Sequence, residues 1–177
     1  TPAKPPSAKV PPGSGPRHLA FSPDGRFASV NGEMGMHVNA FDHYARSGTL
    51  TEIQTVPILP PDVSTDGMGS AEIFCHPNGK WLYVSNRDVA GRGRDSITVF
   101  TMGADGKLTQ VQNAPAGVKV PRGFNLDPTG QWLIVGGQSD SKITVFKINP
   151  LTGELSTTDQ TAAVGAPVCV VFAPVKN

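Results

Sequence analysis

A small set of charged and polar residues has the side chains needed to bind a small anion. A guanidinium group presents a planar fork of N–H donors that can hold a carboxylate or a phosphate through two hydrogen bonds. Arg17, Arg87 and Arg122 are therefore the candidate anion-binding arginines. Glu33, Arg87 and Gln138 are separated by 54 and 51 residues. A structure that repeats with this spacing would bring these three residues to one end of the molecule, and we include Gln138 among the candidate binding residues.

Three residues could activate a water molecule for hydrolysis, because each can accept a proton. They are Glu33, Glu72 and His18. Each has a structural alternative. His18 could be a packed histidine that hydrogen-bonds between two repeat units, and Glu72, one residue before an apolar segment, could bind backbone amides. Arg17 and Arg87 could form ion pairs between repeat units instead of binding a ligand.

The elements that must position these residues are encoded in a sequence that occurs three times. Each copy contains a short apolar segment, a Pro-x-Gly turn and an aromatic or β-branched segment. Proline presets φ for such a turn and glycine accepts the positive φ that it requires. The three turns are 23–25, 77–79 and 128–130. A repeat of roughly 40–50 residues built from short strands and glycine-rich turns is typical of the blades of a β-propeller.

Each repeat divides into four predicted strands. In the second repeat they are 73–75, 81–84, 97–100 and a strand that begins at Leu108. Apolar and polar residues alternate in the third of these segments, which is the period of a half-buried strand. The matching segments of the other two repeats are 19–21, 27–30, 38–41 and from Leu50, then 124–126, 132–135, 143–146 and from Leu155.

The sequence therefore predicts an all-β fold, a partial β-propeller of four-stranded antiparallel blades that spans residues 1–177. The three full blades are expected at about 16–60, 69–115 and 120–162. The segment 166–174 has the pattern of the first strand of a further repeat, and 1–14 that of the tail of a preceding blade. We thus expect three blades with a strand at each end.

Composition excludes several classes of function. The formal net charge is +1, whereas nucleic-acid or anionic membrane binding usually needs a clustered basic excess. We therefore expect neither nucleic acid nor membrane as a partner. No zinc-binding histidine motif, cysteine pair or serine-nucleophile elbow occurs, and we expect no metal and no cofactor. The two cysteines, Cys75 and Cys169, are isolated from each other, and we expect both to be small buried apolar residues.

Several motifs together resemble one known family. They are Gly-Pro-Arg-His-Leu-Ala-Phe-Ser-Pro-Asp-Gly at 15–25, Ser-Ala-Glu-Ile at 70–73, Leu-Tyr-Val-Ser-Asn-Arg at 82–87, Asp-Ser-Ile-Thr-Val-Phe at 95–100, Val-Pro-Arg-Gly-Phe at 120–124 and Pro-Val-Cys-Val-Val-Phe at 167–172. The chain resembles the C-terminal half of the lactonase family of seven-bladed propellers. This family includes propeller-type 6-phosphogluconolactonases and carboxy-cis,cis-muconate cyclase.

The resemblance implies an active site at one end of the central channel. Arg17, Glu33 and Arg87 match residues of the family's candidate site. The implied function is hydrolysis of a small anionic sugar lactone similar to 6-phosphogluconolactone. The alternatives are a non-catalytic binding or scaffold propeller and a cyclase that forms a muconate lactone. We also expect a small anionic substrate, a partner that is either the N-terminal half of the propeller or a second copy of the chain, and a cytoplasmic location.

Overall fold

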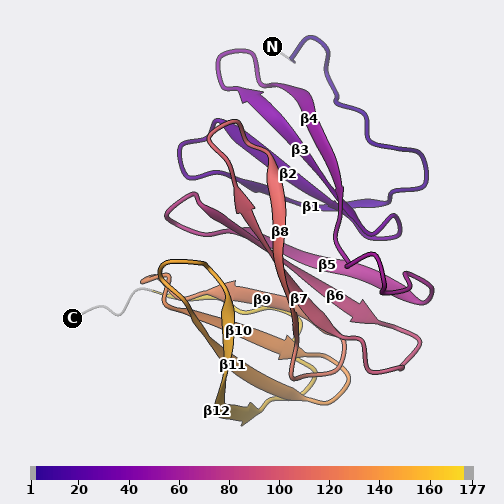
Figure 1. Cartoon of the computed structure of the whole chain (residues 1–177), viewed down its shortest axis with the longest axis vertical. Coiled ribbons are helices and arrows are strands. Elements are labelled where there is room, and N and C mark those ends of the chain that lie inside the picture. The colour runs from indigo at the N-terminus through magenta and orange to yellow at the C-terminus, as the bar shows by residue number, and fades with distance from the viewer. Residues whose placement is uncertain (1–2, 174–177) are drawn as a thin grey trace.

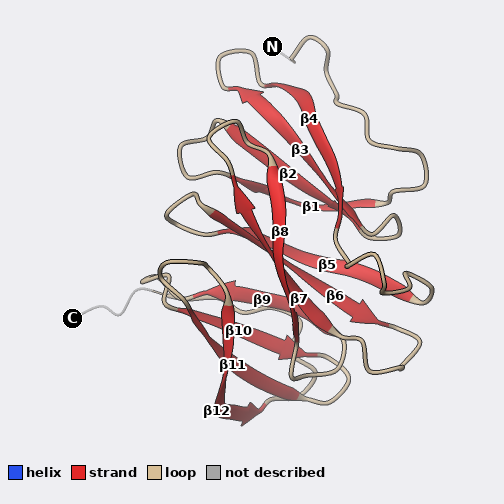
Figure 2. Cartoon of the chain, in the orientation of Figure 1, coloured by secondary structure: helices blue, strands red, loops and turns tan. Residues whose placement is uncertain are grey.

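The computed structural model describes residues 3–173, and these form four-stranded antiparallel sheets without a helix, as Figure 2 shows. We call the three sheets blades 1, 2 and 3. Blade 1 contains β1 (Pro16–Phe21), β2 (Phe27–Gly32), β3 (His37–Tyr44) and β4 (Thr49–Pro57). Blade 2 contains β5 (Met68–Cys75), β6 (Trp81–Asp88), β7 (Ser96–Met102) and β8 (Leu108–Pro115). Blade 3 contains β9 (Pro121–Leu126), β10 (Trp132–Gly137), β11 (Lys142–Ile148) and β12 (Leu155–Ala163).

Within each blade, the four strands lie side by side in the order of the sequence. The blades follow one another along the long axis of the molecule (Figure 1). The first strands lie beside one another, because β5 contacts both β1 and β9. Of the fourth strands, β12 is largely exposed and β4 contains no buried residue. This arrangement confirms the predicted all-β propeller architecture, with the first strand of each blade on the inner side.

Two large apolar cores and a small cluster of Met36, Leu59 and Met68 hold the blades together. The core between blades 1 and 2 is built from Val38, Ala40, Ile58, Ile73, Leu82, Val84, Phe100 and Leu108. A larger core joins blades 2 and 3, and its largest members are Trp81, Tyr83, Phe124 and Phe146. Because β6 lies between both cores, all of its residues are buried. Stability therefore depends on packing between neighbouring blades, as in other repeat architectures.

The turns between the first and second strands have the conformation that the repeat predicts. Gly25 and Gly79 have φ of 69° and 73°. Each amide donates a hydrogen bond of 2.8 Å to the carbonyl three residues earlier, in Ser22 and His76 respectively. These tight turns bring β2 and β6 back along β1 and β5, so that the ends of β2 and β6 lie next to the starts of β1 and β5.

The strands expected at the two ends of the chain are absent from the described residues. No strand forms over 166–173, and residue 174 of that predicted strand lies outside the described range. A strand is held by a ladder of backbone hydrogen bonds with a neighbour, whereas this segment is held at β9 by the Asn125 Nδ2 donor, 3.0 Å from the Val170 carbonyl oxygen. Residues 3–14 also form turns and loop without a strand.

Candidate functional site

Arg17, Glu33 and Arg87 meet where blade 1 contacts blade 2. Arg17 lies in β1, Glu33 directly follows β2, and Arg87 lies near the end of β6. The Glu33 carboxylate pairs with both arginines, with Oε2 3.3 Å from Arg17 Nη1 and Oε1 accepting a hydrogen bond from Arg87 Nη2. The structure thus places two guanidinium groups around one carboxylate, which leaves the cluster with one excess positive charge.

The arginines determine the ionisation of Glu33. Burial raises the pKa of Glu33, but the hydrogen bond and charge of Arg87, together with those of Arg17, outweigh burial and bring the pKa below its usual value. A general base works best when its pKa lies near the working pH. Glu33 is therefore better suited to holding the two arginines in place than to removing a proton from water.

The two arginines differ in accessibility. The side chain of Arg87 is 7 % exposed, and its Nη2 also donates to the Ser70 carbonyl oxygen at 3.1 Å. The side chain of Arg17 is 18 % exposed, and its Nε donates to the Ala71 carbonyl oxygen at 3.1 Å. Arg17 is consequently the arginine that a small anion can approach more easily, while Arg87 is enclosed by the protein.

His18 and Glu72 form a second pair across the same pair of blades. His18 Nδ1 lies 2.5 Å from Glu72 Oε1, and the two side chains are 40 % and 19 % exposed. A carboxylate accepts hydrogen bonds only, so Nδ1 carries the proton in this contact. In the neutral imidazole, Nε2 then keeps its lone pair. The pair combines the inter-blade hydrogen bond considered above with an accessible ring that can accept a proton.

Two side chains that sequence reasoning missed hold the backbone beneath these pairs. Asn31 Oδ1 accepts a hydrogen bond from the His18 amide at 3.0 Å, and Ser85 Oγ accepts one from the Glu72 amide at 2.9 Å. Asn31 Nδ2 also donates to Ser70 Oγ across the blade boundary at 2.8 Å. Asn31 and Ser85 are 54 residues apart, the spacing of the repeat, which is the sequence signal that could have identified them.

These polar contacts coincide with irregular pairing in the first strands. The β1–β2 register shifts between Pro16 and Leu19, and the β5–β6 register shifts between Ser70 and Ile73. Such irregularities redirect side chains and are common beside active sites. As a result, consecutive residues of β1, Arg17 and His18, both line one hollow.

That hollow, which we call the inner groove, has a volume of about 540 Å³. It runs along β1 and β5, with the polar side chains Arg17, His18 and Glu72 and the aromatic rings of Phe21 and Phe74 in its wall. A cavity of this size, with an apolar wall and a few polar groups, is typical of a small-molecule site.

The other two predicted binding residues, Arg122 and Gln138, lie in blade 3. Neither forms a hydrogen bond or ion pair with the described residues of this cluster. The Gln138 amide donates to the Val120 carbonyl oxygen at 3.1 Å. Among the described residues, no hydrogen bond or ion pair involves the side chain of Gln138 or of Arg122. Register alone placed Gln138 with Glu33 and Arg87, and the structure brings only the latter two together.

Residues 3–173 contain neither a metal-binding cluster nor a membrane-spanning helix. No group of three or more histidine, cysteine or acidic side chains in this part is arranged to hold a metal ion. No helix in it has the length and apolar character needed to cross a membrane. Both cysteines are free thiols, but the expectation that both are buried is wrong for Cys169, which is exposed in the segment after β12. Cys75 is half-buried, and burial raises its pKa to about 11.

Known proteins have sequences similar to this chain. The 6-phosphogluconolactonase of Bacillus subtilis is 35% identical over 162 residues, which cover 91% of this chain and 45% of the relative. The enzyme of the same name from Pectobacterium carotovorum is 36% identical over 159 residues, covering 89% of this chain and 46% of the relative. The chain thus spans about half the length of the curated relatives it matches.

Solved structures agree with the sequence comparison. A proposed 6-phosphogluconolactonase of Bacteroides fragilis superposes with a TM-score of 0.87 at 36% identity, covering 98% of this chain and 46% of that one. The periplasmic gluconolactonase of Pseudomonas aeruginosa gives a TM-score of 0.83 at 34% identity, with coverage of 93% and 44%. The family described as lactonase, 7-bladed beta-propeller, matches residues 1–172. The chain therefore belongs to the lactonase family of seven-bladed β-propellers.

Proposed function

We propose that this chain supplies the catalytic groove of a lactonase that hydrolyses a small anionic sugar lactone of the 6-phosphogluconolactone type. The observation that carries the proposal is the joint placement of Arg17 and His18 in one groove, each held by a carboxylate from a different strand. Relatives named 6-phosphogluconolactonase support the same reaction class.

In this proposal Arg17 binds the anionic group of the substrate. The Arg17–Glu33–Arg87 cluster carries an excess positive charge, and Arg17 is its member in the groove wall. Arg87 acts through Glu33, because it is enclosed and donates to that carboxylate. A guanidinium held in place in this way keeps its fork oriented, which favours bidentate recognition of a carboxylate or phosphate.

His18 is the proposed general base. The contact with Glu72 places the proton on Nδ1, so that Nε2 can accept a proton from water. The water oxygen forms a bond to the lactone carbonyl carbon, and the ring C–O bond then breaks. The proton taken by His18 passes to the departing ring oxygen, which becomes a hydroxyl, and the product is an open-chain acid. The reaction needs no redox partner.

The complete propeller is part of the same proposal. Because the chain covers about half of its relatives, the groove would be closed by a further set of blades, either an N-terminal half of the propeller or a second copy of this chain. We place the protein in the cytoplasm as a proposal only. A non-catalytic scaffold and a cyclase forming a muconate lactone are the competing functions, and no contact in the groove favours either.

The test is acid release from 6-phosphogluconolactone by the protein with its propeller complete, followed at constant pH. The parent protein should accelerate ring opening over the spontaneous rate. His18→Gln should lower kcat by about 100- to 10,000-fold, because it removes general base catalysis, while its melting temperature stays within a few degrees. His37→Gln is the matched control, with unchanged turnover, because His37 is a half-buried histidine outside the wall of the inner groove. No acceleration by the folded parent protein would support the scaffold function instead.

A further inference from the structure

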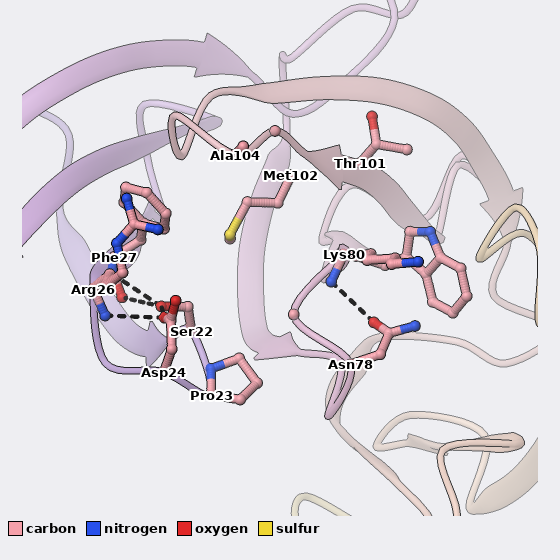
Figure 3. A pocket seen from close by; sticks show the side chains of 13 residues that line it. Ser22, Pro23, Asp24, Arg26, Phe27, Asn78, Lys80, Thr101, Met102 and Ala104 are labelled. Atoms are coloured by element: carbon pink, nitrogen blue, oxygen red, sulfur yellow. Dashed lines mark hydrogen bonds between the residues drawn. The ribbon is translucent and has the colours of Figure 1, made fainter.

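A second hollow, of about 580 Å³, lies at the other end of the junction between blades 1 and 2 (Figure 3). We call it the turn pocket. Three turns enclose it: 22–26 of blade 1, and 78–80 and 103–104 of blade 2. Phe27 and Met102 contribute apolar surface, and Figure 3 shows the Met102 thioether directed into the pocket. The turn pocket shares no lining residue with the inner groove.

At the junction between blades 2 and 3, a histidine ring fills the corresponding position. His76 of blade 2 corresponds to Ser22 of blade 1, and Gly130 corresponds to Gly79, with the spacings of the repeat. Buried His76 packs edge-on against Trp81, with ring centroids 4.7 Å apart. Its Nε2 donates to the Gly130 carbonyl oxygen at 2.9 Å, and its Nδ1 accepts from the Asn78 amide at 3.1 Å. A planar ring with one N–H donor thus fills the junction between blades 2 and 3.

At the junction between blades 1 and 2 this ring is missing. Ser22 Oγ donates to Asp24 Oδ1 at 2.6 Å and accepts from the Phe27 amide at 2.9 Å, so it is used within its own turn. No hydrogen bond joins any described donor to the Gly79 carbonyl oxygen. The turn pocket, which Ser22 and Gly79 line, therefore lies where the His76 ring lies in the next junction, and the Pro23 ring is the side chain next to Gly79.

A second difference between the repeats also gives blade 1 the smaller side chain. Tyr83 in blade 2 corresponds to Ser29 in blade 1. The Tyr83 hydroxyl donates to the Gly153 carbonyl oxygen at 2.9 Å, whereas the buried Ser29 Oγ has no hydrogen-bond partner. Since an unpaired buried polar group is costly, the junction between blades 1 and 2 is both less filled and less satisfied than its neighbour.

The charges around the turn pocket favour an anion. Arg26 and Lys80 are exposed members of its wall. Neither forms an ion pair within residues 3–173. The guanidinium carbon of Arg26 lies 4.9 Å from the centre of the Phe27 ring, which keeps the positive charge over the apolar wall. The single carboxylate of the wall, Asp24, already accepts hydrogen bonds from Ser22 and from the Arg26 amide.

We propose that the turn pocket binds a small planar aromatic carboxylate. Its ring takes the place that the His76 ring has in the next junction, against Phe27 and Met102, and its carboxylate lies between Arg26 and Lys80. A ring with an N–H donor gains a hydrogen bond to the Gly79 carbonyl oxygen. This site is separate from the proposed lactonase groove, and its occupancy does not depend on that activity.

The first experiment compares probes by ligand-observed NMR at pH 8 with the folded protein. Imidazole-4-carboxylate and benzoate should bind with Kd of about 0.1–3 mM, the range expected for ligands of about eight heavy atoms. Benzylamine, which has a similar shape and the opposite charge, should bind at least 10-fold more weakly. Equal binding of benzoate and benzylamine, or no binding of either carboxylate, would overturn the proposal.

The second experiment fills the pocket with the residue that the repeat supplies elsewhere. Ser22→His should weaken benzoate binding at least 10-fold and leave the melting temperature unchanged or raised, because a histidine at this position can make the contacts of His76. Ser47→His, in the exposed turn after β3, is the matched control and should bind like the parent. Lys80→Gln, on the surface, should weaken benzoate several-fold without affecting the fold. Unchanged binding in both Ser22→His and Lys80→Gln would contradict the site.

Discussion

At the scale of single residues, the ion pairs of Arg94 and Arg17 differ in what else surrounds the guanidinium group. Arg94 binds Asp88 through Nε and Nη2, at 3.2 and 2.9 Å, and also donates to the carbonyl oxygens of Ser64 and Asp66. These contacts tie the loop between β6 and β7 to the segment before β5, so Arg94 has a structural role. Arg17, by contrast, shares its carboxylate with Arg87 and lines a groove. The number of carbonyl and carboxylate acceptors around each guanidinium distinguishes a structural arginine from a candidate binding residue.

The Asp88–Arg94 pair should make stability depend on acid pH. The side-chain hydrogen bond from Arg94 lowers the pKa of buried Asp88 to about 2, below the value of about 3.9 in unfolded chains. The stabilisation is therefore complete above about pH 4 and is lost as the pH falls toward 2. Asp88→Asn should cost about 2–4 kcal/mol at pH 7 and reduce this acid dependence. Urea unfolding of both proteins from pH 7 to pH 2.5 measures the effect, and parallel pH curves would contradict it.

At this scale the sequence predicted the types of residue better than their partners. The repeat spacing predicted that Glu33, Arg87 and Gln138 lie at one end of the molecule, and in the structure Glu33 and Arg87 form an ion pair that does not include Gln138. It did not predict that Arg17 reaches the same carboxylate, because this depends on the irregular pairing at the start of β1. The role of Asn31 was missed for the same reason: its side chain binds the His18 amide and the Ala71 carbonyl oxygen, which lie where the register of β1 and β5 shifts.

At the scale of elements, the turns and paired strands follow from local sequence, while the ends do not. Pro-x-Gly turns and alternating segments predicted the strands of all three blades, since both signals act within a few residues. The pattern at 166–174 is equally strand-like, yet no ladder forms over 166–173. An alternating pattern specifies which face of a strand can be buried. A strand forms, however, only where a neighbouring strand provides backbone hydrogen bonds.

The junction between blades 2 and 3 gives an element-scale prediction. Tyr83 is buried, and its hydroxyl donates to the Gly153 carbonyl oxygen in the β11–β12 turn. Tyr83→Phe keeps the ring and removes this hydrogen bond, so we expect a loss of about 1 kcal/mol in unfolding free energy. Tyr44→Phe, at an exposed position, should leave stability within about 0.5 kcal/mol. Chemical denaturation measures both, and equal stabilities would show that the hydroxyl contributes nothing to the junction.

At the scale of the whole molecule, apolar residues remain exposed along the inner side and the last described segment. Leu19 and Phe21 in β1 are 44% and 47% exposed, and Val168 and Val171 are 47% and 78% exposed. Monomeric proteins rarely leave large contiguous apolar patches uncovered. The repeat predicted the fold class, but it gives no information on what covers these residues, because the repeat pattern describes only the blades of this chain.

We therefore expect a protein limited to residues 1–177 to associate in solution. Sedimentation at several concentrations should show dimers or larger species, whereas 18.6 kDa is the mass of one chain. Association should weaken in Leu19→Ser/Phe21→Ser, which removes apolar surface from β1, and should persist in the exposed control Leu151→Ser. A single 18.6 kDa species at all concentrations would mean that the chain covers these residues without a partner.

The central claim is that Arg17 recognises the anionic group of a lactone substrate. The most direct test is the ratio of kcat/KM for 6-phosphogluconolactone to that for the uncharged glucono-δ-lactone, measured with the propeller complete. The parent protein should prefer the phosphorylated lactone, and Arg17→Ala should reduce this ratio by about 30- to 1000-fold, or about 2–4 kcal/mol. Arg17→Lys should restore it only partly, because the planar fork is lost. A ratio that is unchanged in folded Arg17→Ala would contradict the account and leave Arg17 as an ion pair between blades.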